Sequence, residues 1–357
     1  MGIAFDFAHR TAEGPLVSPN VVLPLLSSVI SFIFAGAVLA QWSQKRRGFQ
    51  LVWAIGLLWY GISAGTEFLG SAFGWNETLY RTWYLIGAFF VAAYLGAGTV
   101  VLLARTRFGY FVAASFLFGA FYAFAIRGRY PSDTLAFVVV LIACVATAFA
   151  VAFATWRART LVAPIVLTVL AIGSAIAAAL VFGTDLSAAY ALDPATGVPI
   201  GAAIPGNIRI LAGPFNTIGA FALVVGALFS AYVFMPKLRV LGRRSLPPVV
   251  AQLYGTIAVA VNLLASLPRA TVALVRGDLH SRVPATLLIA LGGFVASAGD
   301  TLNRFGVTGP FAVAKFVAVV FLLTGFLVSI EAFRELRVPF TSIRIGGARR
   351  EVGAQSS

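Results

Sequence analysis

Residues 134–155 read TLAFVVVLIACVATAFAVAFAT, a stretch without a single charged side chain. A helix needs about 20 mainly apolar residues to cross the hydrocarbon core of a bilayer, so this stretch predicts a membrane-spanning helix. Other stretches meet or approach the same length, although 109–126 is short and 284–303 is interrupted by Asp300. The nine predicted spans are 20–41, 49–73, 80–104, 109–126, 134–155, 160–183, 207–235, 284–303 and 310–333.

The composition of the whole chain is typical of a polytopic membrane protein. Of the 357 residues, 60% are apolar and 11% are charged. A soluble domain carries about 25% charged residues, so this chain has less than half the charge needed to cover a water-facing surface. The composition therefore argues against a soluble enzyme, a disordered protein and a nucleic-acid-binding module. It predicts an all-α, polytopic transmembrane helical bundle, which we expect in the cell (cytoplasmic) membrane.

The distribution of basic residues predicts the orientation of this bundle. In helical membrane proteins, the loops rich in lysine and arginine lie in the cytoplasm. With the N-terminus outside, most of the 26 basic residues fall on the cytoplasmic side, provided that the apolar run 247–267 returns to the side it came from. If that run crossed the membrane, the basic tail would face outward. We therefore expect nine spans, an outer N-terminus, a cytoplasmic C-terminus and a cytoplasmic-side hairpin over 247–283.

Three parts follow from this topology: an outer N-terminal segment 1–19, a transmembrane domain 20–333 and a basic cytoplasmic tail 334–357. Within the hairpin, RATVALVRGDLHSR (269–282) alternates basic and apolar residues, as in a helix lying on an anionic leaflet. We expect anionic lipid as a partner at the cytoplasmic face. An amphipathic loop packed against the bundle is the alternative. The net charge of +14 fits the basic loops, so no nucleic acid is expected as a partner.

No known catalytic pattern is visible in the chain. It lacks G-x-x-x-x-G-K-[ST], a strand-linked G-x-G-x-x-G, H-E-x-x-H and C-x-x-C. Its one cysteine, Cys144, lies in an apolar run, and its histidines, His9 and His280, lie outside the predicted spans. We therefore predict no catalytic residue, no metal site and no cofactor. An enzyme of a known class is not expected, and lipid-modifying chemistry stays open.

Small residues recur at helix-packing spacing in the second predicted span. Gly61 and Gly65 form one G-x-x-x-G pair, and Gly70 and Gly74 form another. In lipid, small residues allow helix backbones to approach closely. We expect these faces to pack helices of this chain together, or to bind other membrane proteins.

Charged side chains gather at one depth, near the outer ends of the predicted spans. A charged group at the bilayer centre costs about 2.5–3.5 kcal/mol on insertion scales, so such groups pair or line water. Together with Asn216, which follows the helix-kinking Pro214, they predict an outward-facing polar pocket. The alternative for Asn216 is that it satisfies the backbone carbonyl that Pro214 frees. The candidate ligand-binding residues are Glu67, Arg81, Arg209, Asn216, Asp300 and Lys315, with Arg304 at the same depth.

Two ion pairs are expected in this pocket, Glu67 with Arg81 and Asp300 with Lys315. The spare positive charge would suit an anionic or zwitterionic ligand. The alternative is that these side chains are interfacial anchors that reach the lipid headgroups. Anchoring explains the arginines better than it explains Glu67 and Lys315.

Residues 80–99, YRTWYLIGAFFVAAYLGAGT, contain R-x-W-Y-L-x-G-A and end in G-x-G-T. In this motif, and in 20–73, 208–232 and 287–306, the chain resembles a group of uncharacterised bacterial polytopic membrane proteins with a seven-helix core. The resemblance covers most of the chain and implies the same outer N-terminus and cytoplasmic C-terminus. The pair of helices 109–155 and the hairpin 247–283 would be additions to that core. The resemblance implies no activity, so it assigns no site.

These observations predict small-ligand transport or sensing through the outward-facing pocket, by an integral membrane protein without a catalytic motif. The alternative is a non-catalytic structural or accessory subunit of a larger membrane complex. Its small-residue helix faces and interfacial hairpin would then be docking surfaces. The two costly charges inside spans, Glu67 and Lys315, favour the ligand site.

Overall fold

The computed structural model describes residues 18–130, 133–242, 244–276, 280, 282–329, 336–337 and 344–345. The expected N-terminal segment 1–19 and basic tail 334–357 fall almost entirely outside these residues.

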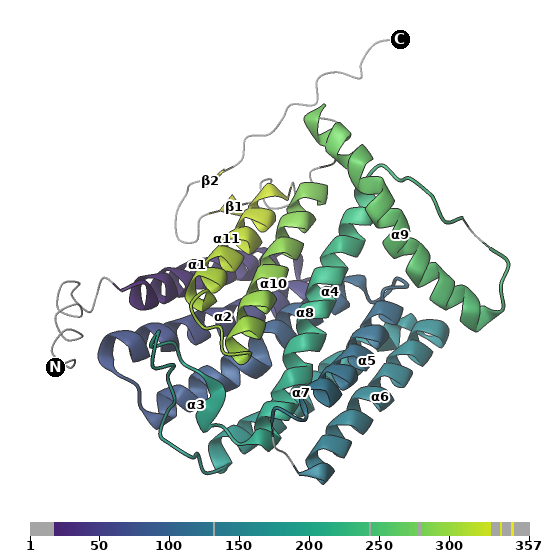
Figure 1. Ribbon diagram of the computed structural model, residues 1–357. Coiled ribbons are helices and arrows are strands. Elements are labelled where there is room, and N and C mark those ends of the chain that lie inside the picture. Colours follow the sequence, from purple (N-terminus) through teal and green to yellow (C-terminus); the bar gives the residue numbers. More distant parts are fainter. Residues whose placement is uncertain are drawn as a thin grey trace.

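Long helices dominate the described part of the chain, and most of them pack side by side in one bundle (Figure 1). The helices are α1 (Pro19–Lys45), α2 (Gly48–Phe73), α3 (Glu77–Leu85), α4 (Val91–Leu103), α5 (Gly109–Ile126), α6 (Thr134–Arg157), α7 (Val162–Gly183), α8 (Gly206–Phe234), α9 (Pro248–Val275), α10 (Arg282–Arg304) and α11 (Phe311–Val328). A π-helical turn, η1 (Ile86–Phe90), joins α3 to α4. Two short 3-10 turns are η2 (Arg159–Leu161) and η3 (Gly201–Ala203). A two-residue strand β1 (Leu336–Arg337) pairs antiparallel with β2 (Arg344–Ile345).

Ten helical segments of the described chain are long and apolar enough to cross a membrane. Nine of them coincide with the nine predicted stretches, and the tenth is Tyr254–Ala273 within α9. Large apolar side chains cover the outer face of α6, where Leu135 is 75% exposed and Phe149 is 69% exposed. Such extensive exposed apolar surface is stable in lipid but not in water. The helical fold predicted from the sequence is thus confirmed, and its long apolar helices fit the predicted membrane protein.

Local signals explain where several of these helices begin and end. Ser18 caps α1 by accepting a hydrogen bond from the backbone N–H of Asn20. Asn76 caps α3 in the same way through the N–H of Leu79. These side chains satisfy amide groups that a helix N-terminus leaves without partners. At the C-terminal end of α2, Gly74 adopts a φ of 98°, a conformation that glycine takes without strain.

Loops that are far apart in the sequence meet at one end of the bundle, which we call the long-loop end because it carries residues 184–205. Asn20 Nδ2 donates to the carbonyl of Thr196 at 2.7 Å, and Asn303 Nδ2 donates to that of Pro199 at 3.3 Å. The Asp133 N–H donates to the Asn207 side chain at 2.7 Å. The starts of α1 and α6 and the end of α10 therefore lie together.

The opposite end, which we call the short-turn end, carries the turns 46–47, 104–108 and 158–161. Every acidic residue that the structure describes lies at the long-loop end, whereas the described charged residues of these three turns are all arginines. Charge is therefore distributed unequally between the two ends of the bundle.

Helix α9 lies at the edge of the bundle and crosses it obliquely (Figure 1). It continues through Pro268, although a proline inside a helix removes one backbone hydrogen bond and its ring crowds the preceding turn. The region expected as a hairpin therefore contains one long helix. Ala270 of α9 packs in one cluster with Met235 after α8 and Val283 of α10. The ring of His280 also stacks on Phe234 at 5.1 Å. The end of α8 and the start of α10 therefore lie at the same end of the bundle.

Glycines determine how closely the central helices approach. A Cβ on Gly96 of α4 would meet the backbone of Gly219 on α8, 2.8 Å from its Cα. On α2, a Cβ on Gly61 would lie 2.9 Å from the ring of Phe32, and one on Gly65 would lie 3.2 Å from Ser28 Oγ. The small-residue face of α2 is therefore occupied by α1 of the same chain.

Candidate functional site

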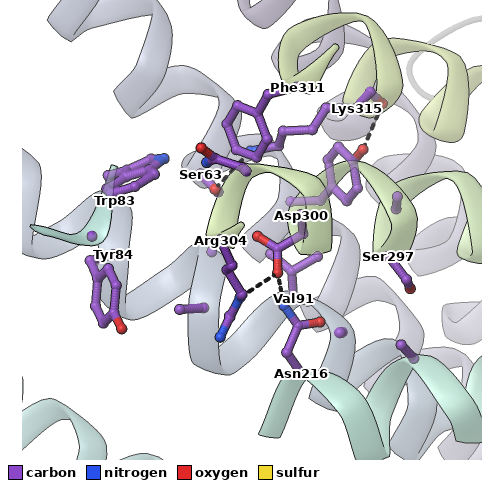
Figure 2. Close-up of a pocket in the computed structure, with 18 of the residues that line it drawn as sticks. Ser63, Trp83, Tyr84, Val91, Asn216, Ser297, Asp300, Arg304, Phe311 and Lys315 are labelled. Carbon is purple, nitrogen blue, oxygen red and sulfur yellow. Dashed lines mark hydrogen bonds and ion pairs between the residues drawn. The ribbon is translucent and has the colours of Figure 1, made fainter. Parts of the chain in front are cut away.

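A cavity of about 260 Å³ lies at the long-loop end, between α2, the α3–η1–α4 helix, α8, α10 and α11. Residues 200–202 of the long loop also line it. Figure 2 shows Asp300 and Arg304 projecting from the same helix, with Asn216 reaching toward Asp300 and with Trp83 and Tyr84 at the other side. The polar side chains that line the cavity are Tyr60, Ser63, Trp83, Tyr84, Arg129, Tyr130, Arg209, Asn216, Ser297, Asp300, Asn303, Arg304 and Lys315.

One group of polar side chains is centred on Lys315 of α11. Its ammonium lies 2.6 Å from the Glu67 carboxylate of α2 and 3.2 Å from Ser63 Oγ. Trp83 Nε1 of α3 donates to the same Glu67 oxygen at 2.7 Å. The Tyr60 hydroxyl donates to the backbone carbonyl of Lys315 at 2.6 Å. Because only 4% of the Glu67 side chain and 15% of the Lys315 side chain are exposed, this ion pair is held away from bulk solvent.

A second group is centred on Asp300 of α10. Arg304, one turn later, donates from Nε to Asp300 Oδ2 at 3.0 Å. Asn216 Nδ2 of α8 donates to the same oxygen. The Asp300 side chain remains 29% exposed, so its second oxygen can still face the cavity.

Two further arginines, Arg129 and Arg209, line the cavity. The Arg209 guanidinium lies 4.0 Å from the centre of the Tyr130 ring, and that of Arg129 lies 4.8 Å from the centre of the Phe305 ring. An aromatic face attracts a cation without neutralising its charge. Among the described residues neither arginine forms a salt bridge, so both charges remain unneutralised beside the cavity.

Arg81, which the sequence placed in the same pocket, does not line the cavity. Its guanidinium donates to Glu77 at 2.8 and 2.6 Å, and also to the backbone carbonyls of Thr184, at 2.8 Å, and Val181. These carbonyls belong to the end of α7. Arg81 therefore ties α3 to α7.

The predicted pairing of the charges was wrong in both cases. Arg81 pairs with Glu77 and Asp300 pairs with Arg304, each across one turn of a single helix. Residues four apart on a helix are neighbours, so each of these ion pairs needs only its own helix and no contact between helices. Glu67 and Lys315, which have no such local partner, pair with each other between α2 and α11.

Several cavity residues were missed in the sequence. They include Trp83, Tyr84 and Arg129, all of which line the cavity. Asn303 was also missed, because only its charged neighbours Asp300 and Arg304 were selected in the sequence and not the uncharged amide. Its position three residues after Asp300 could have placed it on the polar face of the same helix.

The helix that contributes Trp83 and Tyr84 changes its geometry at the cavity. The π-helical turn η1 interrupts it at Ile86–Phe90, and two residues of this turn, Gly87 and Ala88, line the cavity. Such turns insert one extra residue into a helix and are frequent at functional sites. Here the turn separates the polar face of α3 from the apolar face of α4.

A second cavity, of about 600 Å³, lies between α4, α5, α6, α7 and α8. Its lining is mostly apolar and includes Cys144 and Phe215. None of the ionisable groups of the first cavity lines it. The polar chemistry of the described chain is therefore concentrated at the long-loop end.

Comparisons of the chain with protein-family models, with curated proteins and with solved structures find no match. Function is therefore inferred from the geometry of the site.

Proposed function

We propose that this chain is a multi-pass protein of the cytoplasmic membrane that binds a small ligand in the polar cavity, for transport or for sensing. One observation carries the proposal: the Glu67–Lys315 and Asp300–Arg304 pairs come from helices α2, α10 and α11 and meet around one cavity. Charges inside membrane-spanning helices are costly and mostly mark ligand or ion pathways. Anchors at the headgroups would not need to converge.

The proposed orientation has nine crossings, an outer N-terminus and a cytoplasmic C-terminus. The basic turns at the short-turn end support it, because positively charged loops remain in the cytoplasm. In this arrangement α9 lies against the cytoplasmic side of the bundle, and its exposed Arg269, with Arg276 directly after the helix, faces anionic lipid. The long-loop end then faces outward, and the ligand enters the cavity from outside the cell.

The size of the cavity limits the ligand. Pockets for drug-sized molecules measure about 300–1,000 Å³. A cavity of about 260 Å³ is slightly smaller, so it suits a small metabolite or nutrient. Ile200 and Ala202 of the long loop line the cavity, so the ligand would pass this loop as it enters from outside.

Native mass spectrometry of gently extracted protein tests this function. A retained small molecule on a single chain supports the cavity as a ligand site, and its loss from the Ser297→Leu variant, which fills the cavity, places it there. Co-purified polypeptides in fixed ratio, with no small molecule, would indicate the accessory-subunit function instead. Uptake of the identified molecule into proteoliposomes then separates transport from sensing, because a sensor binds the ligand without moving it.

A further inference from the structure

We infer that the ligand of this cavity is a small organic oxyanion, a carboxylate or a phosphate ester, that also carries a hydroxyl or amino hydrogen-bond donor. This inference rests on the proposed function and adds the chemical class of the ligand. It is carried by three features of the cavity: unneutralised positive charge, an unpaired donor and an unpaired acceptor.

The charge of the lining side chains favours an anion. Four cationic side chains line the cavity, and only one carboxylate, that of Asp300, lines it with them. Glu67, behind the lining, pairs with Lys315, and Asp300 pairs with Arg304. Arg129 and Arg209 are left facing aromatic rings. A guanidinium presents two parallel donors that match the oxygens of a carboxylate or a phosphate.

A hydroxyl beside these arginines has no protein partner. Tyr84 is 7% exposed and lines the cavity, and its hydroxyl forms no hydrogen bond with a described residue. A Cβ on Gly201 would lie 2.9 Å from the Tyr84 ring and 3.7 Å from Arg209 Nε, so ring and guanidinium border the same point of the long loop. Because this hydroxyl is not sealed inside the protein, a ligand in the cavity can supply its partner. An oxyanion held by Arg209 would accept the Tyr84 hydroxyl hydrogen.

An acceptor on the same cavity also lacks a partner. Asn303 is 9% exposed, and its Oδ1 is buried with no hydrogen bond. Its Nδ2 must face the carbonyl of Pro199, since a carbonyl can only accept, and this contact fixes Oδ1 as the free atom. The matching group on a ligand is a hydrogen-bond donor. A simple anion without a hydroxyl or amino group would leave Asn303 unsatisfied.

The test measures the thermal unfolding temperature of the purified full-length protein in detergent with a panel of size-matched compounds. The panel contains lactate and glycine, propionate as a carboxylate without a donor, glycerol 3-phosphate, neutral glycerol and cationic choline. Arg209→Gln and Tyr84→Phe probe the anion contacts, and Asn303→Leu probes the donor contact. Arg127→Gln is the matched control, because Arg127 is exposed at the same end and does not line the cavity.

We expect lactate, glycine or glycerol 3-phosphate to stabilise the protein more than propionate, with no effect of glycerol or choline. Removing a hydrogen bond to a charged group should weaken that binding by about tenfold or more in Arg209→Gln and in Tyr84→Phe. In Asn303→Leu, lactate and glycine should stabilise the protein no more than propionate does. If lactate and glycine stabilise the protein and glycerol 3-phosphate does not, the ligand is a carboxylate. If glycerol 3-phosphate alone stabilises it, the ligand is a phosphate ester.

Other outcomes separate the inference from the proposed function. Stabilisation by glycerol or choline that survives Arg209→Gln but not Ser297→Leu overturns the anion inference and leaves the cavity as a ligand site. Equal stabilisation by lactate and propionate overturns the donor requirement. If no compound stabilises the protein and native mass spectrometry finds no bound molecule, both the inference and the proposed function are rejected.

Discussion

The Lys315 ammonium of α11 lies 2.6 Å from the Glu67 carboxylate of α2, although the two residues are 248 positions apart in the chain. The pair therefore joins the beginning of the bundle to its last described helix. Trp83 of α3 donates to the same carboxylate, so three helices meet at one group. This contact holds α2 and α11 together at the wall of the cavity, where Lys315 is one of the lining residues.

The first prediction concerns this pair. Glu67→Gln keeps an acceptor for Trp83 but leaves the Lys315 charge unpaired, and Lys315→Met leaves the Glu67 charge unpaired. Removing one partner of a buried ion pair costs roughly 3–5 kcal/mol. Each single variant should therefore unfold at a clearly lower temperature in detergent than the parent protein does.

The double variant Glu67→Gln/Lys315→Met is the control for this effect. It removes both charges together, so most of the lost stability should return. If both single variants unfold at the parent temperature, the pair does not connect α2 and α11 in the membrane protein. If the double variant is as unstable as the worse single variant, stranded charge is not the cause.

The nine apolar stretches could be predicted because the length of an apolar run is a local property of the sequence. The depth of Glu67, Asp300 and Lys315 followed from their positions within those runs. The choice of partners did not follow, because it depends on how helices are rotated toward one another. The rule that residues four apart are neighbours would have assigned Arg304 to Asp300, and that signal was available.

The second prediction separates Arg81 from the ligand site. Its guanidinium donates to Glu77 and to carbonyls at the end of α7, and a lysine ammonium cannot reproduce this planar fork. Arg81→Lys should therefore lower the free energy of unfolding by about 1.5–3 kcal/mol, the range for a hydrogen bond to a charged group. Ligand affinity at a permissive temperature should not change. Arg105→Lys, at an exposed position on the turn between α4 and α5, should change neither quantity.

The third prediction concerns Asp193 in the long loop. The backbone N–H of Ala195 and the Thr308 hydroxyl donate to its carboxylate at 2.8 Å each. These hydrogen bonds lower the pKa of Asp193 below its ordinary value of 3.8. The ionised form is thus favoured in the folded loop. Its contribution to stability is present above the ordinary pKa and is lost as the pH falls through the lowered pKa.

Hydrogen–deuterium exchange of residues 184–205 checks this dependence. Between about pH 6 and pH 2, after correction for intrinsic exchange, the parent loop should lose protection at the acid end. Asp193→Ala should have low protection throughout. Asp185→Ala is the control, because Asp185 lies exposed in the same loop. A parent loop that keeps full protection far below the ordinary pKa would show that the Asp193 charge does not hold it to Thr308.

The last prediction concerns the crossing of α4 and α8. A methyl group on Gly96 would meet the Gly219 backbone, and one on Gly219 would lie 2.5 Å from the backbone nitrogen of Ala93. Overpacking of this kind costs about 1–3 kcal/mol, so Gly96→Ala and Gly219→Ala should unfold at lower temperature. Because Asn216 lies one turn before Gly219 on α8, moving this helix should also draw Asn216 away from Asp300 and weaken ligand binding.

Gly36→Ala on α1 is the matched control: nothing lies within 4 Å of its added methyl group, and the gain in helix propensity is up to about 1 kcal/mol. Equal stability of all three variants would contradict a direct backbone contact between α4 and α8.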